Sequence, residues 1–349
     1  MPVIQTDALV IGAGPVGLFQ VFQLGLLDIK AHVVDSLPHP GGQCAELYAD
    51  KPIYDIPGTP RTTGRELVAS LLQQIKPFGA SFHLCQEVST LAQQDDGRFL
   101  VETSRTSFLA KTIFIAAGVG SFQPKRLKIA GLDSFEGSQL FHHADESARF
   151  AGKNVLVVGG DEAAVDSAIR LAGPGPQQSK SVTLLHRRDV LQASAEVLAH
   201  FGALRESGAA SFQVGQVTDI TTEDGKLTAA RITDVDGNTT ALPVDCMLVL
   251  LGLSPRLGPL SQWGLAMERK QLQVDTEKFS TSIPGIFAVG DINTYPGKKK
   301  LILCGFHECT LAAYAAAEII FPGQKIPFQY TTTSPKLHKL LGVELPRAD

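Results

Sequence analysis

Residues 7–17 read Asp-Ala-Leu-Val-Ile-Gly-Ala-Gly-Pro-Val-Gly, an apolar run followed by three glycines spaced as Gly-x-Gly-x-x-Gly. The apolar run predicts a buried strand, and the apolar residues after Gly17 predict a helix. Gly12 permits the tight turn between them, Gly14 lets the backbone approach a pyrophosphate, and Gly17 lets the helix pack closely on the strand. The segment therefore predicts the first strand, turn and helix of a dinucleotide-binding unit.

An acidic residue stands where such a unit needs one. Residues 31–35 predict the second strand, which ends at Asp35. A carboxylate there accepts hydrogen bonds from ribose hydroxyls, and the free N–H groups at the start of the helix, near Pro15 and Val16, favour phosphates. The glycine pattern alone is weak, because glycines are common in tight turns for structural reasons. Strand, helix and acid in register together predict a dinucleotide site.

The same pattern starts again in the middle of the chain. Residues 154–158 predict a buried strand, Gly159 and Gly160 open a turn, and a helix follows. We therefore expect an α/β protein of two Rossmann-like nucleotide-binding domains, each with three layers (ββα), the second inserted into the first. The predicted boundaries are 1–123 and 254–349 for the first domain and 124–253 for the second.

Local signals identify further elements. Thr63 and Glu66 have the spacing of a capping box, which predicts the start of a helix at this point. Residues 217–245 alternate short apolar runs with the turn pairs Asp224-Gly225 and Asp236-Gly237. This second pattern predicts an antiparallel meander.

Composition excludes several classes of protein. The 349 residues carry a net charge of −4, so the molecule as a whole is no nucleic-acid binder. No apolar run reaches the roughly 18 residues of a membrane helix. The five cysteines include no Cys-x-x-Cys pair, and their odd number argues against a secreted disulfide framework. We expect a cytoplasmic protein without a metal site.

Two further stretches bear on which dinucleotide is bound. Gly41-Gly42-Gln43 follows soon after Asp35, and a late strand predicted at residues 286–289 ends in Gly290-Asp291. Together with the first glycine turn, these stretches resemble the FAD domain of the thioredoxin-reductase-like flavoproteins. The resemblance implies that the Asp291 carboxylate contacts the ribityl and pyrophosphate part of FAD, although an acid in this place is also a common helix N-cap.

The second domain resembles the NADPH-binding domain of the same flavoproteins and departs from it at two positions. Arg187 and Arg188 follow the strand predicted at residues 181–185, where paired guanidinium groups suit a 2′-phosphate, although exposed arginines often form surface ion pairs. Asp161 replaces a glycine that faces the pyrophosphate, and Gln192 replaces a further arginine. Weak binding, a different nucleotide and a degenerate site therefore stay open. The residues predicted to bind NADP(H) are Gly159, Gly160, Arg187 and Arg188.

The whole chain resembles one subfamily in particular. Where thioredoxin reductases carry a redox Cys-x-x-Cys, residues 141–149 contain no cysteine, which excludes a built-in disulfide relay. Several stretches instead resemble the bacterial ferredoxin–NADP reductases of thioredoxin-reductase type. These stretches are residues 44–48, 51–57, 121–125, 290–297, 305–308, 328–334 and 341–343.

Cofactors, partner and reaction follow from this resemblance. It implies a homodimer with FAD and NADP(H) as cofactors and ferredoxin or flavodoxin as partner. Hydride from NADPH would pass to N5 of the flavin, and electrons would then leave singly to an iron–sulfur protein, without a catalytic side chain. An acidic ferredoxin calls for a local basic surface. The candidates, which are equally well explained as solvated loops, are Lys125, Arg126 and Lys128, and Lys298, Lys299 and Lys300.

The same resemblance implies individual flavin contacts. Tyr48 would stack on one face of the flavin, and Tyr330, in a C-terminal tail reaching over from the partner subunit, would cover the other. Thr332 would bond near the ring edge. The residues expected to bind FAD are Gly12, Gly14, Pro15, Val16, Gly17, Asp35, Gly42, Gln43, Tyr48, Val88, Phe122, Asp291, Tyr330 and Thr332.

Two other functions stay open at this point. One is a diverged flavoprotein reductase that uses NADH or another electron donor and acceptor. The other is a flavin-binding redox sensor whose nucleotide site is degenerate. Reduction of the flavin by NADPH, by NADH or by neither nucleotide distinguishes the three functions.

Overall fold

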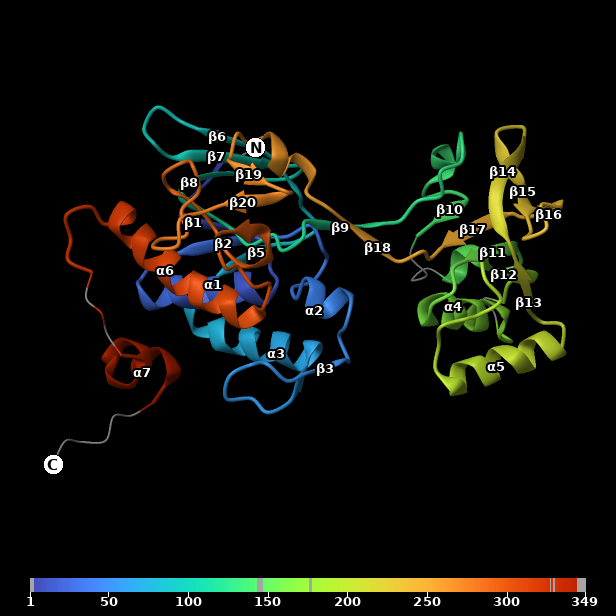
Figure 1. The fold of residues 1–349 in the computed structure, drawn as a ribbon, viewed down its shortest axis with the longest axis horizontal. Coiled ribbons are helices and arrows are strands. Elements are labelled where there is room, and N and C mark those ends of the chain that lie inside the picture. The colour runs from blue at the N-terminus through green and yellow to red at the C-terminus, as the bar shows by residue number, and fades with distance from the viewer. Residues whose placement is uncertain (1–2, 143–146, 176–177, 327, 329, 344–349) are drawn as a thin grey trace. The chain divides into compact units, whose positions relative to one another are not determined.

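The computed structural model describes residues 3–142, 147–175, 178–326, 328 and 330–343 (Figure 1). The chain divides into two compact units, and the second, Gln123–Ser254, interrupts the first, Met1–Phe122 with Pro255–Asp349. Each unit contains a parallel sheet with helices packed on one face and further strands on the other. The predicted fold class, an α/β protein with one Rossmann-like domain inserted into another, is confirmed.

A parallel sheet in the order β5-β2-β1-β8-β21 forms the centre of the first unit. Its strands are β1 (Val3–Ile11), β2 (Ala31–Val34), β5 (Ser81–His83), β8 (Ser107–Ile115) and β21 (Ile286–Ala288). β21 pairs with the end of β8, although the whole second unit lies between these strands in the chain. The first unit is therefore completed only by the C-terminal part of the sequence.

Different elements cover the two faces of this sheet. Helices α1 (Pro15–Leu26), α3 (Gly64–Ile75) and α6 (Ile302–Ile320) pack on one face around a core that includes Phe114 and Phe287 (Figure 1). The buried side of α6 is rich in alanine, which permits a close approach to α1. The antiparallel strands β6 (Val88–Gln93) and β7 (Phe99–Thr103) contribute to the core on the other face.

The second unit repeats this three-layer plan. Its parallel sheet has the order β10-β17-β11-β12-β13, with two helices on one face and an antiparallel sheet on the other. The antiparallel sheet confirms the meander predicted over residues 217–245, with Asp224 and Gly225 in its first turn. The elements are β10 (Leu140–Phe141), β11 (Asn154–Val158), α4 (Glu162–Ala172), β12 (Ser181–His186), α5 (Ala195–Glu206), β13 (Ser211–Val214), β14 (Gln216–Glu223), β15 (Lys226–Thr233), β16 (Thr239–Pro243) and β17 (Cys246–Val249).

The chain enters and leaves the second unit along one paired ribbon. Strands β9 (Ser121–Pro124) and β18 (Leu253–Arg256) pair with each other. The remaining helices and strands are α2 (Gln43–Glu46), β3 (Pro52–Ile53), β4 (Thr62–Thr63), β19 (Met267–Glu268), β20 (Gln271–Gln273), β22 (Asn293–Thr294) and α7 (Pro335–Leu341). Among the residues that the structure describes, no helix has both the length and the apolar character needed to span a bilayer.

The capping box at the start of α3 is confirmed and allows a test. Thr63 Oγ1 accepts the N–H of Glu66 at 3.2 Å, and the Glu66 carboxylate accepts the N–H of Thr63 at 2.8 Å. We expect Thr63→Ala to lower the free energy of unfolding by about 1 kcal/mol, because it leaves a helix N–H unpaired. The chain has one tryptophan, Trp263, in the first unit, so its fluorescence during urea unfolding of the flavin-free protein measures this change. An unchanged urea midpoint would contradict the prediction.

Candidate functional site

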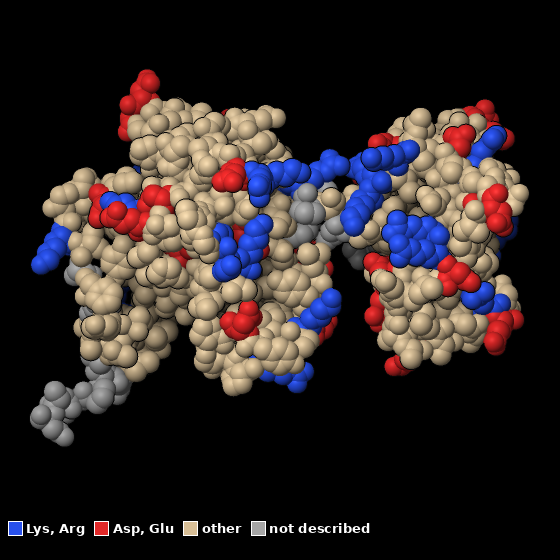
Figure 2. Space-filling view, viewed as in Figure 1, with Lys and Arg blue, Asp and Glu red and all other residues tan. Residues whose placement is uncertain are grey.

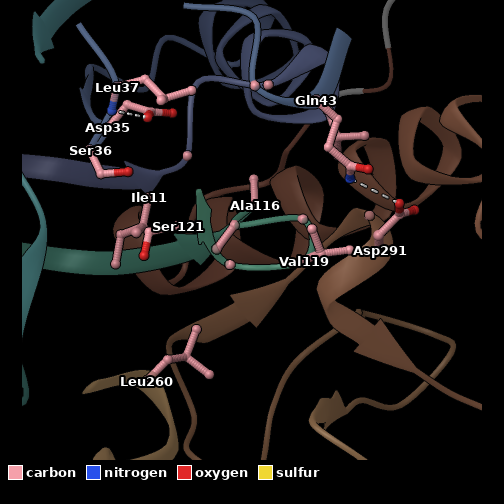
Figure 3. A pocket seen from close by; sticks show the side chains of 18 of the residues that line it. Ile11, Asp35, Ser36, Leu37, Gln43, Ala116, Val119, Ser121, Leu260 and Asp291 are labelled. Atoms are coloured by element: carbon pink, nitrogen blue, oxygen red, sulfur yellow. Dashed lines mark hydrogen bonds between the residues drawn. The ribbon is translucent and has the colours of Figure 1, made fainter. Parts of the chain in front are cut away.

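A pocket opens in the first unit where the parallel strands end (Figure 3). It encloses about 1080 Å³ of empty space, part of it open solvent, and its lining includes the last residues of β1 and β2 and the residues that follow β21. Ligands of open parallel sheets bind at the carboxyl ends of the strands. Figure 3 shows Asp35 and Asp291 on separate sides of this pocket, with Ala116 and Val119 between them. The pocket is thus long enough to present different side chains to different parts of an extended ligand.

The three glycines of the first turn have different surroundings. Gly12 has a φ of +108°, and a Cβ on it would collide with the carbonyl oxygen of Ala116. A Cβ on Gly17 would collide with the carbonyl oxygen of Gly12. At Gly14 the nearest atom to such a Cβ is Gly42 Cα, at 4.0 Å. Gly12 and Gly17 therefore permit close packing, whereas Gly14 leaves room for a ligand to approach the backbone.

The N-terminus of α1 faces the pocket without a side-chain cap. Gly14 is the N-cap residue, Pro15 is the first helical residue, and the first turn contains no acidic side chain. Gly14, Pro15 and Val16 all line the pocket. A helix terminus of this kind carries a partial positive charge and attracts phosphate groups.

Asp35 is fixed by backbone donors at the end of β2. Its Oδ2 accepts the N–H of Ala13 at 2.6 Å, and its Oδ1 accepts the N–H of Leu37 at 2.8 Å. Burial raises the pKa of the Asp35 carboxyl and outweighs these hydrogen bonds, which lower it. Each carboxylate oxygen has a further lone pair for a ribose hydroxyl.

Gln43 and Asp291 join distant parts of the chain at the other side of the pocket. Gln43 Nε2 donates to Asp291 Oδ2 at 3.3 Å, as the dashed line in Figure 3 marks. Tyr48 also lines the pocket, and its hydroxyl accepts a hydrogen bond from the Cys44 thiol at 3.5 Å. Burial is the main cause that raises the pKa of the Tyr48 hydroxyl, so this ring stays neutral.

Most residues predicted for the first site line this one pocket. They are Gly12, Gly14, Pro15, Val16, Asp35, Gly42, Gln43, Tyr48, Val88 and Asp291. Gly17 lies beneath the turn instead, and the Phe122 side chain lies outside the described residues. Tyr330 and Thr332 are exposed and do not line the pocket of their own chain.

The sequence patterns do not predict several residues that line the pocket. Leu257, Leu260 and Trp263 come from a short segment after β18, and Ile302 comes from the start of α6. Their only sequence signal is an apolar character that they share with core residues. Their position in the pocket depends on tertiary packing.

The glycine turn of the second unit follows the same packing rule as the first. A Cβ on Gly159 would collide with the carbonyl oxygen of Leu250, and one on Gly160 would collide with the ring of His186. Asp161 is the N-cap of α4, and its Oδ1 accepts the N–H of Ala164 at 3.1 Å. A carboxylate therefore stands at the helix terminus that would face an anion.

Two arginines lie near this capped terminus. Arg187 and Arg188 are exposed just beyond the end of β12, which is His186. The pKa of His186 is lowered mainly by burial and further by the two guanidinium charges, while Asp161 opposes this shift. The structure thus places these charged side chains around one glycine turn.

The proposed basic surfaces are only partly available. Arg126 pairs with Asp133 at 3.2 Å and with Glu136 at 2.6 Å, so its charge is balanced locally. The assignment of Lys298 to a basic surface is wrong, because its side chain is only 6% exposed and pairs with the buried Glu308. On the face that Figure 2 draws, lysine and arginine side chains gather along the segment that joins the two units and on part of the second unit, while acidic side chains are scattered over both.

The comparisons with known proteins fit this architecture. A profile of the pyridine nucleotide-disulphide oxidoreductase family matches residues 6–317. The chain belongs to this family. Two relatives of this oxidoreductase, from Polaromonas sp. (strain JS666) and Albidiferax ferrireducens, are each named ferredoxin–NADP reductase. They are 62% and 61% identical over 347 residues, which cover 99% of this chain and 95% and 98% of theirs.

A solved structure also shares the fold of this oxidoreductase. Thioredoxin reductase from Lactococcus lactis aligns with a TM-score of 0.57 over 90% of this chain and 99% of its own. The sequence identity of this pair is 24%, so the likeness concerns the fold alone.

The five cysteines of this oxidoreductase differ in burial, and this difference predicts the order in which they react. All five are free. Burial raises the pKa of the Cys44, Cys246 and Cys309 thiols, whereas Cys85 is exposed and Cys304 is half-buried. We expect iodoacetamide at neutral pH to modify Cys85 first and Cys304 more slowly, and the other three only after denaturation. Peptide mass spectrometry over a time course measures the order, and rapid modification of Cys44 in the native protein would contradict it.

Proposed function

We propose that this protein is a ferredoxin–NADP reductase, an FAD-dependent oxidoreductase that transfers electrons between NADPH and ferredoxin. The single observation that carries the proposal is the identity of 58–62% to proteins of that name, over 99% of this chain. Local features agree with it, since the chain has an extended pocket with a dinucleotide turn and no Cys-x-x-Cys. A flavodoxin is the alternative one-electron partner.

FAD belongs in the pocket of the first unit, Met1–Phe122 with Pro255–Asp349. The uncapped terminus of α1 and the open side of Gly14 fit a pyrophosphate, Asp35 fits a ribose, and the half-buried Tyr48 fits a flavin ring. When bound, FAD supplies the chemistry that exchanges one hydride for two single electrons. The residues of the chain orient the cofactor and exclude water, so no side chain acts as a general acid or base.

NADP(H) belongs at the glycine turn of the second unit, Gln123–Ser254. Gly159 and Gly160 let the turn pack closely against Leu250 and His186, and the exposed Arg187 and Arg188 suit bidentate binding of the 2′-phosphate. Asp161 opposes the pyrophosphate charge at this site. Arg187 and Arg188 thus favour a nucleotide with a 2′-phosphate, whereas Asp161 weakens the binding of its pyrophosphate.

The functional molecule is a cytoplasmic homodimer. Phe328 and Tyr330 are 69% and 67% exposed, and α7 after them carries the exposed Leu340 and Leu341. Exposed aromatic and aliphatic side chains in one short segment favour contact with another protein surface. A tail that covers the flavin of the partner subunit would bury them, with Tyr330 against the ring and Thr332 at its edge.

Two measurements on the protein with bound FAD test the proposed function. We expect NADPH to reduce the flavin faster than NADH does in anaerobic stopped-flow experiments, since the arginines favour the 2′-phosphate. We expect cytochrome c reduction by NADPH to require added ferredoxin. A protein that binds no FAD, or a reduced flavin that ferredoxin does not oxidise, would contradict the proposal.

Asp161 allows a separate test of nucleotide binding. We expect Asp161→Asn and Asp161→Gly to lower the Kd for NADP⁺ about fivefold each, because a charge at a helix terminus is worth ~1 kcal/mol. Asn keeps the cap on Ala164 N–H, so an equal effect of both substitutions assigns it to the charge rather than to the cap. Isothermal titration with NADP⁺ measures both values. Unchanged affinity in both variants would show that Asp161 does not hinder the phosphates.

A further inference from the structure

A carboxylate is completely buried beside the proposed flavin pocket. Glu308, on α6, has 0% exposure, and four donors surround its two oxygens. Oε2 accepts the Gly290 N–H at 2.7 Å and the Asn293 amide at 2.8 Å. Oε1 accepts the Tyr295 hydroxyl at 2.9 Å and the Lys298 ammonium. Burial of a charge is tolerated only with such complete hydrogen bonding.

Lys298 and Glu308 both form hydrogen bonds with the backbone of Gly290. Lys298 Nζ donates to Glu308 and also to the carbonyl oxygen of Gly290 at 2.9 Å. Glu308 in turn accepts the N–H of the same Gly290. Both polar groups of the Gly290 backbone are therefore held by one buried ion pair.

The turn that begins at Gly290 has little freedom to move. Gly290 has a φ of +80°, and a Cβ on it would lie 3.2 Å from Val16 Cγ1. A Cβ on Gly305 of α6 would lie 2.5 Å from the Val16 side chain and 3.3 Å from Gly290 Cα. The carbonyl oxygen of the next residue, Asp291, accepts the Gln271 amide at 3.2 Å. Packing and hydrogen bonds together fix the backbone that carries the Asp291 side chain into the pocket.

A contribution to the stability of the fold does not explain why this buried pair is charged. Desolvation of two charges offsets most of their attraction, and an apolar pair of similar volume is often as stabilising. An apolar pair, however, cannot donate to a carbonyl oxygen and accept from an N–H of the same residue. The directional contacts to Gly290 are what the charged pair adds.

We propose that Lys298 and Glu308 are positioning residues for FAD: their ion pair fixes the Gly290–Asp291 turn, and through it the Asp291 carboxylate. This inference rests on the proposed function, because Asp291 serves FAD only if the first pocket binds it. The two residues contribute to cofactor affinity without touching the cofactor.

The test measures FAD binding to flavin-free protein. We expect Glu308→Gln and Lys298→Met to raise the Kd for FAD about 10- to 100-fold, the size of the loss in metal affinity when a hydrogen-bond partner of a metal ligand is removed. Quenching of FAD fluorescence during titration gives the Kd. The visible circular dichroism of the bound flavin reports any change in the protein environment of its ring. The matched control is Glu318→Gln, a substitution on the same helix as Glu308 that breaks the exposed 3.0 Å ion pair between Glu318 and Lys278. Its Kd should equal that of the wild type.

A double-variant cycle separates positioning from general stability. If Glu308 acts through Asp291, then Glu308→Gln in an Asp291→Ala background should raise the Kd further by less than about twofold. Fully additive effects would overturn the inference. Tyr295→Phe, which removes one donor to Glu308 and no charge, should weaken FAD binding by a smaller factor.

The outcomes also distinguish this inference from the proposed function. Wild-type protein that binds no FAD overturns both, whereas wild-type binding with unchanged binding by Glu308→Gln overturns only the positioning role. If a single variant does not fold, as judged by Trp263 fluorescence and circular dichroism, the double variant Lys298→Met/Glu308→Gln replaces it, since it leaves no unpaired buried charge. Normal FAD affinity in that folded double variant would also overturn the inference.

Discussion

Backbone atoms occupy the space where side chains would stand at Gly12 and Gly17, and the first unit depends on this close packing. The carbonyl oxygen of Ala116 lies against Gly12, and that of Gly12 lies against Gly17. The contact brings α1 onto the sheet and directs its N-terminus into the pocket. Any side chain at either position would separate helix and sheet and displace Gly14 from the ligand. The second unit uses the same device at Gly159, which packs against the carbonyl of Leu250.

Local chemistry made part of this structure predictable from the sequence. The glycine turns, the capping box at Thr63 and the meander with its Asp-Gly turn depend on neighbouring residues, and each lies where it was predicted. Asp35 and Asp291 were assigned from motif positions, and both line the same pocket. Short-range constraints therefore specified the elements and the main polar groups around the pocket.

Long-range packing explains what the sequence did not reveal. Three consecutive lysines at positions 298–300 suggest a solvated loop, yet the first of them is buried because Glu308 approaches it from α6. Trp263 and Leu260 carry no motif and reach the pocket only through the path of the chain after β18. Asp161 looked like a defect in a glycine motif, and the structure shows that it also caps α4. Which of these side chains are buried, and which groups they contact, depends on segments that are distant in the sequence.

The insertion of one unit into the other has a consequence for synthesis on the ribosome. Residues 123–254 are contiguous, so the second unit has all its strands as soon as it emerges. The first unit lacks β21 until Ala288 has been made and α6 until Ile320 has been made, and both elements pack against its N-terminal half. At ~5–20 residues per second, the early strands wait many seconds for these partners. The unit that begins later in the chain can thus fold earlier, while the end of β8, Ile113–Ile115, has an unpaired edge open to aggregation until β21 pairs with it.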